Sequence, residues 1–315
     1  MSLSGSMGRP KSDYAPSEID RLSEREVIAL LLNAKQYTVP GAVGVDHILR
    51  VTDTLVAKYC HDIEENVTEP SEALTLDLVF RYTTIPVPRV RRIISLETNG
   101  AKYILMDRIP GRQLSSVWQD MSLQERLRIV FTLHDYVRQL QAIRHPRSAI
   151  PGPLAPGNEA RECTSPVWGR LIEERGPFSS YNDFSAWFDQ AQRVAIDALK
   201  NWQIPANLRS TSFKQIMGSS PLVLCHQDLH MRNIIVGDDG RLWVIDWGDA
   251  GFYPPWFEYL SMKLQSENEE TVMHRKEHLW DLMIPFICGP YFQEERWLAL
   301  VSAAFSYKFE RVGRR

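Results

Sequence analysis

The chain has 315 residues and 44% hydrophobic content, which is enough to bury one large core or two modest ones. Its formal net charge of -3 and its pI near 6.3 give no basic field, which argues against a nucleic acid or an anionic membrane as partner. No apolar run reaches the length of a membrane span and no secretory signal is visible, so we expect a cytoplasmic protein, with residues 1–6 resembling the remnant of an expression tag.

The first 106 residues predict a small sheet with two helices. Ser23 and Glu26 form a capping box that begins a short helix. Asn99-Gly100 is a strong signal for a hairpin turn. Strands are predicted at residues 47–51, 54–60, 89–96 and 101–106, and a second helix at residues 70–82.

The middle of the chain is mostly helical. Ser122 and Glu125 form a second capping box, and the helix that follows extends to about Arg144 with apolar residues at core spacing. Residues 145–177 are rich in proline and glycine and predict a long loop, which in a compact domain is usually functional or mobile. A helix is predicted at residues 184–202, and two or three more after Trp256.

Polar residues in the segment 222–246 stand where three short predicted strands end. The apolar runs 222–225, 234–236 and 242–245 predict a strand, a loop and a hairpin with an Asp-Asp-Gly turn. The hairpin brings Asn233 at its entrance close to Asp246 at its exit. Their amide and carboxylate oxygens suit Mg²⁺, which takes its other ligands from water and substrate phosphates. Asp228, five residues before Asn233, can accept a proton from a substrate hydroxyl.

The motif resembles that of a known family. His226-x-Asp228-x-x-x-x-Asn233, followed by Asp246-Trp247-Gly248, is similar to the catalytic loop and metal-binding motif of the protein-kinase-like superfamily. The flanking residues resemble the aminoglycoside phosphotransferase and choline kinase branch, particularly its fungal members. The resemblance implies an α+β, two-lobed protein-kinase-like fold, with a small antiparallel sheet lobe carrying one helix and a larger, mainly helical lobe. It implies an ATP-binding lobe at 7–106, a hinge at 107–111 and a catalytic and substrate-binding lobe at 112–315.

The resemblance also implies an ATP site in the first lobe. The segment Val56-Ala57-Lys58 resembles the third strand of kinases, where Lys58 would bind the α- and β-phosphates and Glu72 would hold Lys58. An edge-strand lysine that reaches solvent remains the alternative for Lys58, and a solvated glutamate in the first helical turn remains the alternative for Glu72.

Two further nucleotide contacts follow from the same resemblance. Gly41 and Gly44 stand where the family has its phosphate-covering loop, although two glycines three apart are also typical of a plain turn. The backbone of Asp107 and Ile109 matches the hinge positions that bind adenine. Because backbone groups bind the base there, the side chains do not indicate a preference between ATP and GTP.

The implied activity is transfer of the γ-phosphate of ATP to a hydroxyl of a small molecule such as an aminoglycoside, a choline-like compound or a sugar. Asp228 would be the base, with Mg²⁺ held by Asn233 and Asp246. His230 stands where protein kinases carry a lysine, and it is either a transition-state contact or a structural loop residue. By the same resemblance, His226 would orient the loop.

The segment between Asp246 and Glu258 is short, which distinguishes this chain from protein kinases. Glu258, which resembles the acid that braces the catalytic loop, follows Asp246 by only twelve residues, leaving no room for a long activation segment. A protein kinase is therefore the less favoured alternative. A kinase-fold binding or regulatory protein without turnover is a further alternative, and the sequence does not indicate the oligomeric state.

Other candidate sites are weaker. His274-x-x-Glu277-His278 matches a zinc metalloprotease pattern with both histidines on one helical face, but a solvated charged helix is favoured. The four cysteines are widely spaced, which predicts reduced thiols. Five aromatic residues are candidate walls of the acceptor pocket, although such clusters are more often core: Trp247, Phe252, Tyr253, Trp256 and Phe257.

Overall fold

The computed structural model describes residues 15–37, 48–60, 69–96, 100–168, 175–217, 221–274 and 276–306. Its internal contacts divide the chain into two compact units. The first comprises Met1–Ile129 and Met231–Asp246, and the second comprises Val130–His230 and Trp247–Arg315. The units do not follow chain order because a hairpin near residue 240 pairs with a strand near residue 112. Sheets and helices are combined in an α+β fold.

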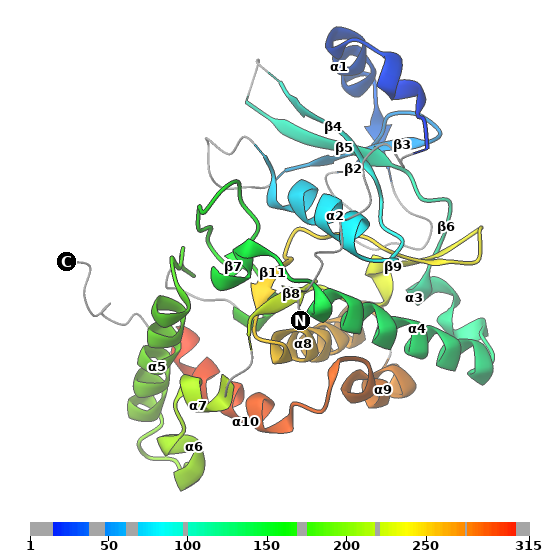
Figure 1. Ribbon diagram of the computed structural model, residues 1–315. Coiled ribbons are helices and arrows are strands. Elements are labelled where there is room, and N and C mark those ends of the chain that lie inside the picture. The colour runs from blue at the N-terminus through cyan, green and yellow to red at the C-terminus, as the bar shows by residue number, and fades with distance from the viewer. Residues whose placement is uncertain are drawn as a thin grey trace, which may run out of the picture. The chain divides into compact units, whose positions relative to one another are not determined.

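The first unit is built on a five-stranded antiparallel sheet (Figure 1). The strand order is β1-β2-β3-β5-β4, so β3 lies in the middle. The bounds are β1 Lys35–Gln36, β2 Ile48–Arg50, β3 Leu55–Tyr59, β4 Val90–Ser95 and β5 Lys102–Asp107. The four strands predicted here are confirmed to within one residue at each end, whereas the two-residue β1 was not predicted.

Helices α1 (Glu24–Leu32) and α2 (Ser71–Tyr82) pack against different residues of β3. Successive side chains of a strand point to opposite faces of a sheet. Ala57 packs in one apolar cluster with Val27 and Leu31 of α1. The next residue, Lys58, forms an ion pair with Glu72 of α2. One face of the sheet is therefore apolar, and the other carries an ion pair.

A second, three-stranded sheet completes the first unit. Its order is β10-β9-β6, with β6 at Gly111–Gln113, β9 at Ile234–Gly237 and β10 at Leu242–Val244. The predicted β9–β10 hairpin is confirmed, and β6 was not predicted. Gly111 has a φ of 147°, and a Cβ there would overlap the carbonyl oxygen of Val236. Glycine is therefore required for β6 to approach β9. The short helices α3 (Leu114–Val117) and η3 (Trp118–Asp120) follow.

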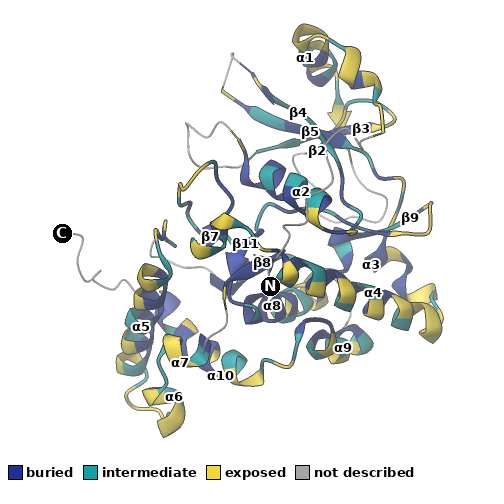
Figure 2. Cartoon of the chain, in the orientation of Figure 1, coloured by how far each residue is buried: buried dark blue, intermediate teal, exposed yellow. Residues whose placement is uncertain are grey.

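The second unit is mainly helical and has an aromatic core. Helix α4 (Leu123–Ala142) enters it at Val130. Trp168 packs against five aromatic rings at centroid distances of 5.0–6.2 Å, and one face of α5 is buried on this core (Figure 2). The other helices are α5 Tyr181–Ala198, α6 Ala206–Ser210, α7 Phe213–Met217, α8 Trp256–Met273, α9 His278–Cys288 and α10 Phe292–Val301.

The long loop predicted at residues 145–177 contains regular structure. It includes two 3₁₀ helices, Pro146–Ala149 and Pro166–Trp168, and strand β7 (Gly152–Pro153). β7 pairs with β11 (Gly251–Tyr253), which also pairs with β8 (Val223–Cys225). Such short strands form because a partner strand is nearby, which the local sequence does not reveal. In the described part of the chain, no helix is both long and apolar enough to cross a membrane.

Candidate active site

Lys58 is held by two carboxylates from distant parts of the chain. Its Nζ lies 2.7 Å from Oε2 of Glu72 on α2 and 2.6 Å from Oδ1 of Asp246, which follows β10. The side chains of Lys58 and Glu72 are 18% and 8% exposed, whereas that of Asp246 is 46% exposed. The first unit therefore brings three predicted site residues together, with only Asp246 substantially open to solvent.

The two carboxylates keep Lys58 charged. Burial alone would lower the pKa of Lys58, but the charges of Asp246 and Glu72 outweigh this effect and raise the pKa above its usual value. The edge-strand alternative for Lys58 is wrong because β3 lies between β2 and β5. The solvated alternative for Glu72 is also wrong because its side chain is buried against Lys58.

Asn233 and Asp246 occupy neighbouring positions at the base of the β9–β10 hairpin. The amide of Ile245 donates a hydrogen bond of 3.0 Å to the carbonyl oxygen of Asn233, one step beyond the last strand pair. Asp246 then adopts a φ of 64°, a left-handed conformation that is uncommon for a residue other than glycine. This turn ends the strand at the residue that contacts Lys58.

Asn233 and Asp246 offer an amide oxygen and a carboxylate, which are hard oxygen donors. Among the described residues, no three His, Cys, Asp or Glu side chains form a group that could hold a metal ion. Mg²⁺ is commonly held by one or two protein oxygens together with waters and phosphate oxygens. The pair therefore suits a metal that arrives with a nucleotide.

In the second unit, α8 braces the loop that follows β8. Glu258 is buried and accepts hydrogen bonds from the amides of His226 and Gln227, the second at 3.2 Å. Ser261 donates a hydrogen bond to the carbonyl oxygen of Gln227, whose φ is 67°. Burial raises the pKa of Glu258 to about 7, although the two amide hydrogen bonds oppose this shift. These contacts match the bracing role expected for Glu258.

His226 orients the same loop. Its side chain is fully buried, and its Nδ1 accepts a hydrogen bond of 3.1 Å from the amide of Asp228. The imidazole packs edge-on against Trp247, with ring centroids 4.4 Å apart. The backbone position of Asp228 is therefore fixed from two sides, by His226 and by the hydrogen bonds to Glu258.

Two residues that the sequence did not single out contact Asp228 and His230. Gln265 of α8 donates a hydrogen bond to Oδ1 of Asp228, and Oε1 of Glu269 lies 3.0 Å from Nδ1 of His230. Nε2 of His230 lies 3.5 Å from Oδ1 of Asp228. Burial lowers the pKa of His230, but the carboxylates of Asp228 and Glu269 outweigh this effect and raise the pKa to about 9. The four-residue spacing of Gln265 and Glu269 places them on one helix face, but it does not indicate that this face contacts Asp228 and His230.

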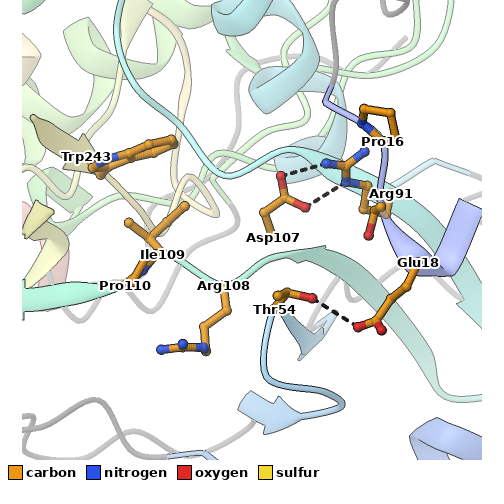
Figure 3. A pocket seen from close by; sticks show the side chains of 10 residues that line it. Pro16, Glu18, Thr54, Arg91, Asp107, Arg108, Ile109, Pro110 and Trp243 are labelled. Carbon is orange, nitrogen blue, oxygen red and sulfur yellow. Dashed lines mark hydrogen bonds and ion pairs between the residues drawn. The ribbon is translucent and has the colours of Figure 1, made fainter. Parts of the chain in front are cut away.

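The segment predicted as the hinge borders a cavity of about 420 Å³ (Figure 3). The carboxylate of Asp107 accepts hydrogen bonds of 2.6 and 3.0 Å from Arg91, and its amide donates to the carbonyl oxygen of Arg89. The lining also includes Ile109 and Trp243 but none of the residues of the Lys58 cluster. The cavity therefore does not include the Lys58 cluster, and adenine binding at Asp107 and Ile109 stays a prediction.

The aromatic residues expected to form walls of an acceptor pocket are core residues. Tyr253 and Phe257 stack with centroids 5.5 Å apart, and Trp256 packs against Phe257 at 4.5 Å. Each of the five is at most 2% exposed: Trp247, Phe252, Tyr253, Trp256 and Phe257. The alternative that they are core residues is confirmed, and the candidate role as pocket walls is wrong, because side chains buried to this extent do not face a ligand.

The histidines of the His274-x-x-Glu277-His278 pattern do not share a helical face. Helix α8 ends at Met273, His274 has a left-handed φ of 51°, and α9 begins at His278. The metalloprotease pattern therefore lacks the helix that it requires. Gly41 and Gly44, the predicted phosphate-covering loop, lie outside the described residues.

Comparison with solved structures supports the fold. The GDP complex of wild-type aminoglycoside 2'-phosphotransferase-IIIa is 12% identical with a TM-score of 0.52, and covers 89% of this chain and 88% of that one. The GDP complex of a mutant of that enzyme is 12% identical with a TM-score of 0.50, covering 88% and 85%. The fold is thus the two-lobed protein-kinase-like fold of these enzymes.

Comparison by sequence gives the family. A subtelomeric hrmA-associated cluster protein of Aspergillus fumigatus is 33% identical over 81 residues, which are 25% of this chain and only 16% of that relative. The model of the APH phosphotransferase enzyme family matches residues 46–280, well over half of the 315 residues. This chain belongs to the APH phosphotransferase enzyme family.

Proposed function

We propose that the chain transfers the γ-phosphate of ATP to a hydroxyl group of a small molecule. The observation that carries the proposal is the ion-pair cluster of Lys58, Glu72 and Asp246. A partly buried lysine that two carboxylates keep protonated is suited to bind phosphate oxygens as a point charge. In this proposal Lys58 binds the α- and β-phosphates, and Glu72 holds the lysine in position.

The remaining nucleotide contacts are assigned to the same unit. Asn233 and Asp246 would hold Mg²⁺, which when bound neutralises negative charge on the phosphates. The backbone of Asp107 and Ile109 would bind the adenine, with Gly41 and Gly44 over the phosphates. Because the two similar solved structures are GDP complexes, GTP is the alternative donor.

Asp228 is the proposed general base. The hydroxyl oxygen of the acceptor attacks the γ-phosphorus, the bond from that phosphorus to the bridging oxygen breaks, and ADP leaves while the hydroxyl proton moves to Asp228. A base must stay within hydrogen-bonding reach of the proton that it accepts. The backbone contacts of Glu258 and His226, and the side-chain contact of Gln265, favour a fixed position for Asp228.

A small acceptor is favoured over a peptide. Helix α8 begins at Trp256, ten residues after Asp246, and strand β11 already occupies part of the interval. A protein kinase uses a long segment at this place to hold its peptide. The acceptor classes that we propose are aminoglycosides, choline-like amines and sugars. The motif resembles the aminoglycoside phosphotransferase and choline kinase branch, and the two similar structures are aminoglycoside phosphotransferases.

The test is nucleotide consumption with Mg²⁺, measured separately with ATP and GTP over a library of aminoglycosides, hydroxylated amines and sugars. We expect consumption to follow one acceptor class. Asp228→Asn should lower kcat by about 10²- to 10⁴-fold, because general-base catalysis contributes on this order. The matched control is Asp238→Asn, an exposed aspartate in the turn of the β9–β10 hairpin, which should leave turnover unchanged.

Two results would count against the proposal. If Asp246→Ala kept near-normal turnover, the assignment of Asp246 as a metal ligand would be wrong. If the chain bound nucleotide but consumed none with any acceptor class, a binding or regulatory protein would be favoured instead.

A further inference from the structure

Side chains of α8 and of the loop that follows β8 are linked by three connected contacts. Gln265 and Glu269 are four residues apart on α8, so they lie on the same side of the helix. Gln265 contacts Asp228, Glu269 contacts His230, and His230 contacts Asp228. One face of α8 thus contacts the proposed base directly through Gln265, and indirectly through Glu269 and the imidazole of His230.

We propose that Gln265 and Glu269 are positioning residues for Asp228, with Gln265 acting directly and Glu269 acting through His230. This inference rests on the proposed function, because it takes Asp228 as the base. Both routes converge on the same oxygen, Oδ1. Two contacts on one carboxylate oxygen restrict the rotation of the carboxylate, and a fixed orientation is what a proton acceptor requires.

The geometry makes Glu269 the closer partner of His230. The distance from Nδ1 to Glu269 is 3.0 Å, which is a hydrogen bond, whereas the distance from Nε2 to Asp228 is 3.5 Å, which is long for one. Glu269 therefore determines the orientation of the ring, and the ring presents its second nitrogen to Asp228. His230 is 3% exposed with a carboxylate beside each nitrogen, so it acts as a charged link to Asp228.

Burial explains why the charge of Glu269 matters. Glu269 is 6% exposed, and a buried carboxylate is unfavourable unless a cation or hydrogen-bond donors offset its charge. A protonated imidazole between two carboxylates supplies the positive charge that offsets it. Replacing Glu269 with glutamine keeps the size of the side chain but removes half of the negative charge that holds the ring protonated. We expect the ring to lose its fixed orientation.

The kinetic test uses the acceptor identified in the consumption assay. Glu269→Gln and His230→Gln should each lower kcat on the order of 10- to 100-fold, with little change in KM for the nucleotide, since misplacement of a reacting group has effects of this size. The double variant should be no slower than the slower single variant, because both changes interrupt the same route. Losses that multiply in the double variant would overturn the proposal.

Matched variants separate positioning from loss of folding. Glu267→Gln changes an exposed glutamate of the same helix and should leave kcat unchanged. Glu269→Asp keeps the charge and should recover part of the rate. A loss in Glu269→Gln that Glu269→Asp does not relieve at all would contradict a role for the charge.

A second readout does not depend on activity. In ¹⁵N NMR spectra of the histidine side chains at pH 7.5, the His230 ring should carry protons on both nitrogens in the wild type and lose one in a measurable fraction of Glu269→Gln molecules. An unchanged His230 ring in Glu269→Gln would overturn the proposal even if the enzyme were active. If the wild type turned over no acceptor, the proposed function would fail, and the NMR result alone would then decide whether Glu269 controls His230.

Discussion

Lys58 is a partly buried cation and His230 a buried one, and each is held by two carboxylates. Lys58 lies between Glu72 and Asp246 in the first unit, and His230 lies between Asp228 and Glu269 in the second. Burial lowers the pKa of each cation, and in each case the carboxylates more than reverse the shift. The stability of the fold is therefore linked to the same ion pairs that the proposed chemistry uses.

The protonation of His230 predicts a pH-dependent stability. Its pKa is about 9 in the folded chain against about 6.5 in the unfolded chain, so the folded state prefers the protonated ring. The stabilisation is complete below pH 6.5, declines as pH rises, and is absent above pH 9. It amounts to at most about 3 kcal/mol. We expect the stability difference between wild type and His230→Gln, measured by urea unfolding, to shrink by up to this amount between pH 6.5 and 9. A stability difference that stays constant between pH 6.5 and 9 would contradict the ion pairs of His230 with Asp228 and Glu269.

The sequence predicted the motif residues and Glu258 but not Gln265 and Glu269, which contact Asp228 and His230. Asp228, Asn233 and Asp246 lie at fixed spacings within one short segment, which can be read from the chain directly. Glu269 lies 39 residues after His230, on a helix whose position could not be predicted from its apolar pattern. Partners that depend on the register of a distant helix need the tertiary structure.

Among the strands too, those that follow a local apolar pattern could be predicted, and those that depend on a distant partner strand could not. Strands of the five-stranded sheet follow apolar runs bounded by turn residues, which is why β2, β3, β4 and β5 could be predicted to within one residue. β6, β7 and β11 have two or three residues each and exist because a partner strand lies beside them: β9 beside β6, β11 beside β7, and β8 beside β11. Helix α8 is the element that holds the loop of Asp228, since Glu258, Gln265 and Glu269, which contact this loop, all lie on it.

The bracing of the loop by α8 can be tested at Glu258. Its two carboxylate oxygens accept hydrogen bonds from two different amides, so Glu258→Gln retains one acceptor and turns an NH₂ group toward the other amide. We expect the free energy of unfolding to fall by roughly 1–3 kcal/mol, the effect of leaving a buried donor unsatisfied. Chemical denaturation would measure it, with the exposed Glu267→Gln on the same helix as control. Equal stability of the two variants would show that the loop does not depend on Glu258.

At the scale of the whole molecule, neither unit is continuous in sequence. The segment Met231–Asp246 belongs with the first 129 residues, although it directly follows a loop of the second unit. The lobe boundaries predicted from the sequence follow chain order, because a local pattern carries no information about which distant strand a hairpin joins. As a consequence, the Lys58 cluster forms only when residues from both segments of the first unit are folded together. Nucleotide binding there should therefore stabilise the folded chain as a whole.

This coupling predicts a thermal shift that depends on Lys58. A ligand at a hundred times its Kd stabilises the folded state by about 2.7 kcal/mol. For a chain of this size, that corresponds to a rise in Tm of roughly 5 °C. We expect Mg²⁺ with a non-hydrolysable ATP analogue to raise the Tm of the wild type by this amount and to raise that of Lys58→Met little or not at all. Lys58→Met should also have a lower Tm without ligand, because Glu72 and Asp246 then lose their shared cation. Lys35→Met, an exposed lysine of the same sheet, should behave as the wild type. A full shift in Lys58→Met would mean that the nucleotide binds away from the cluster.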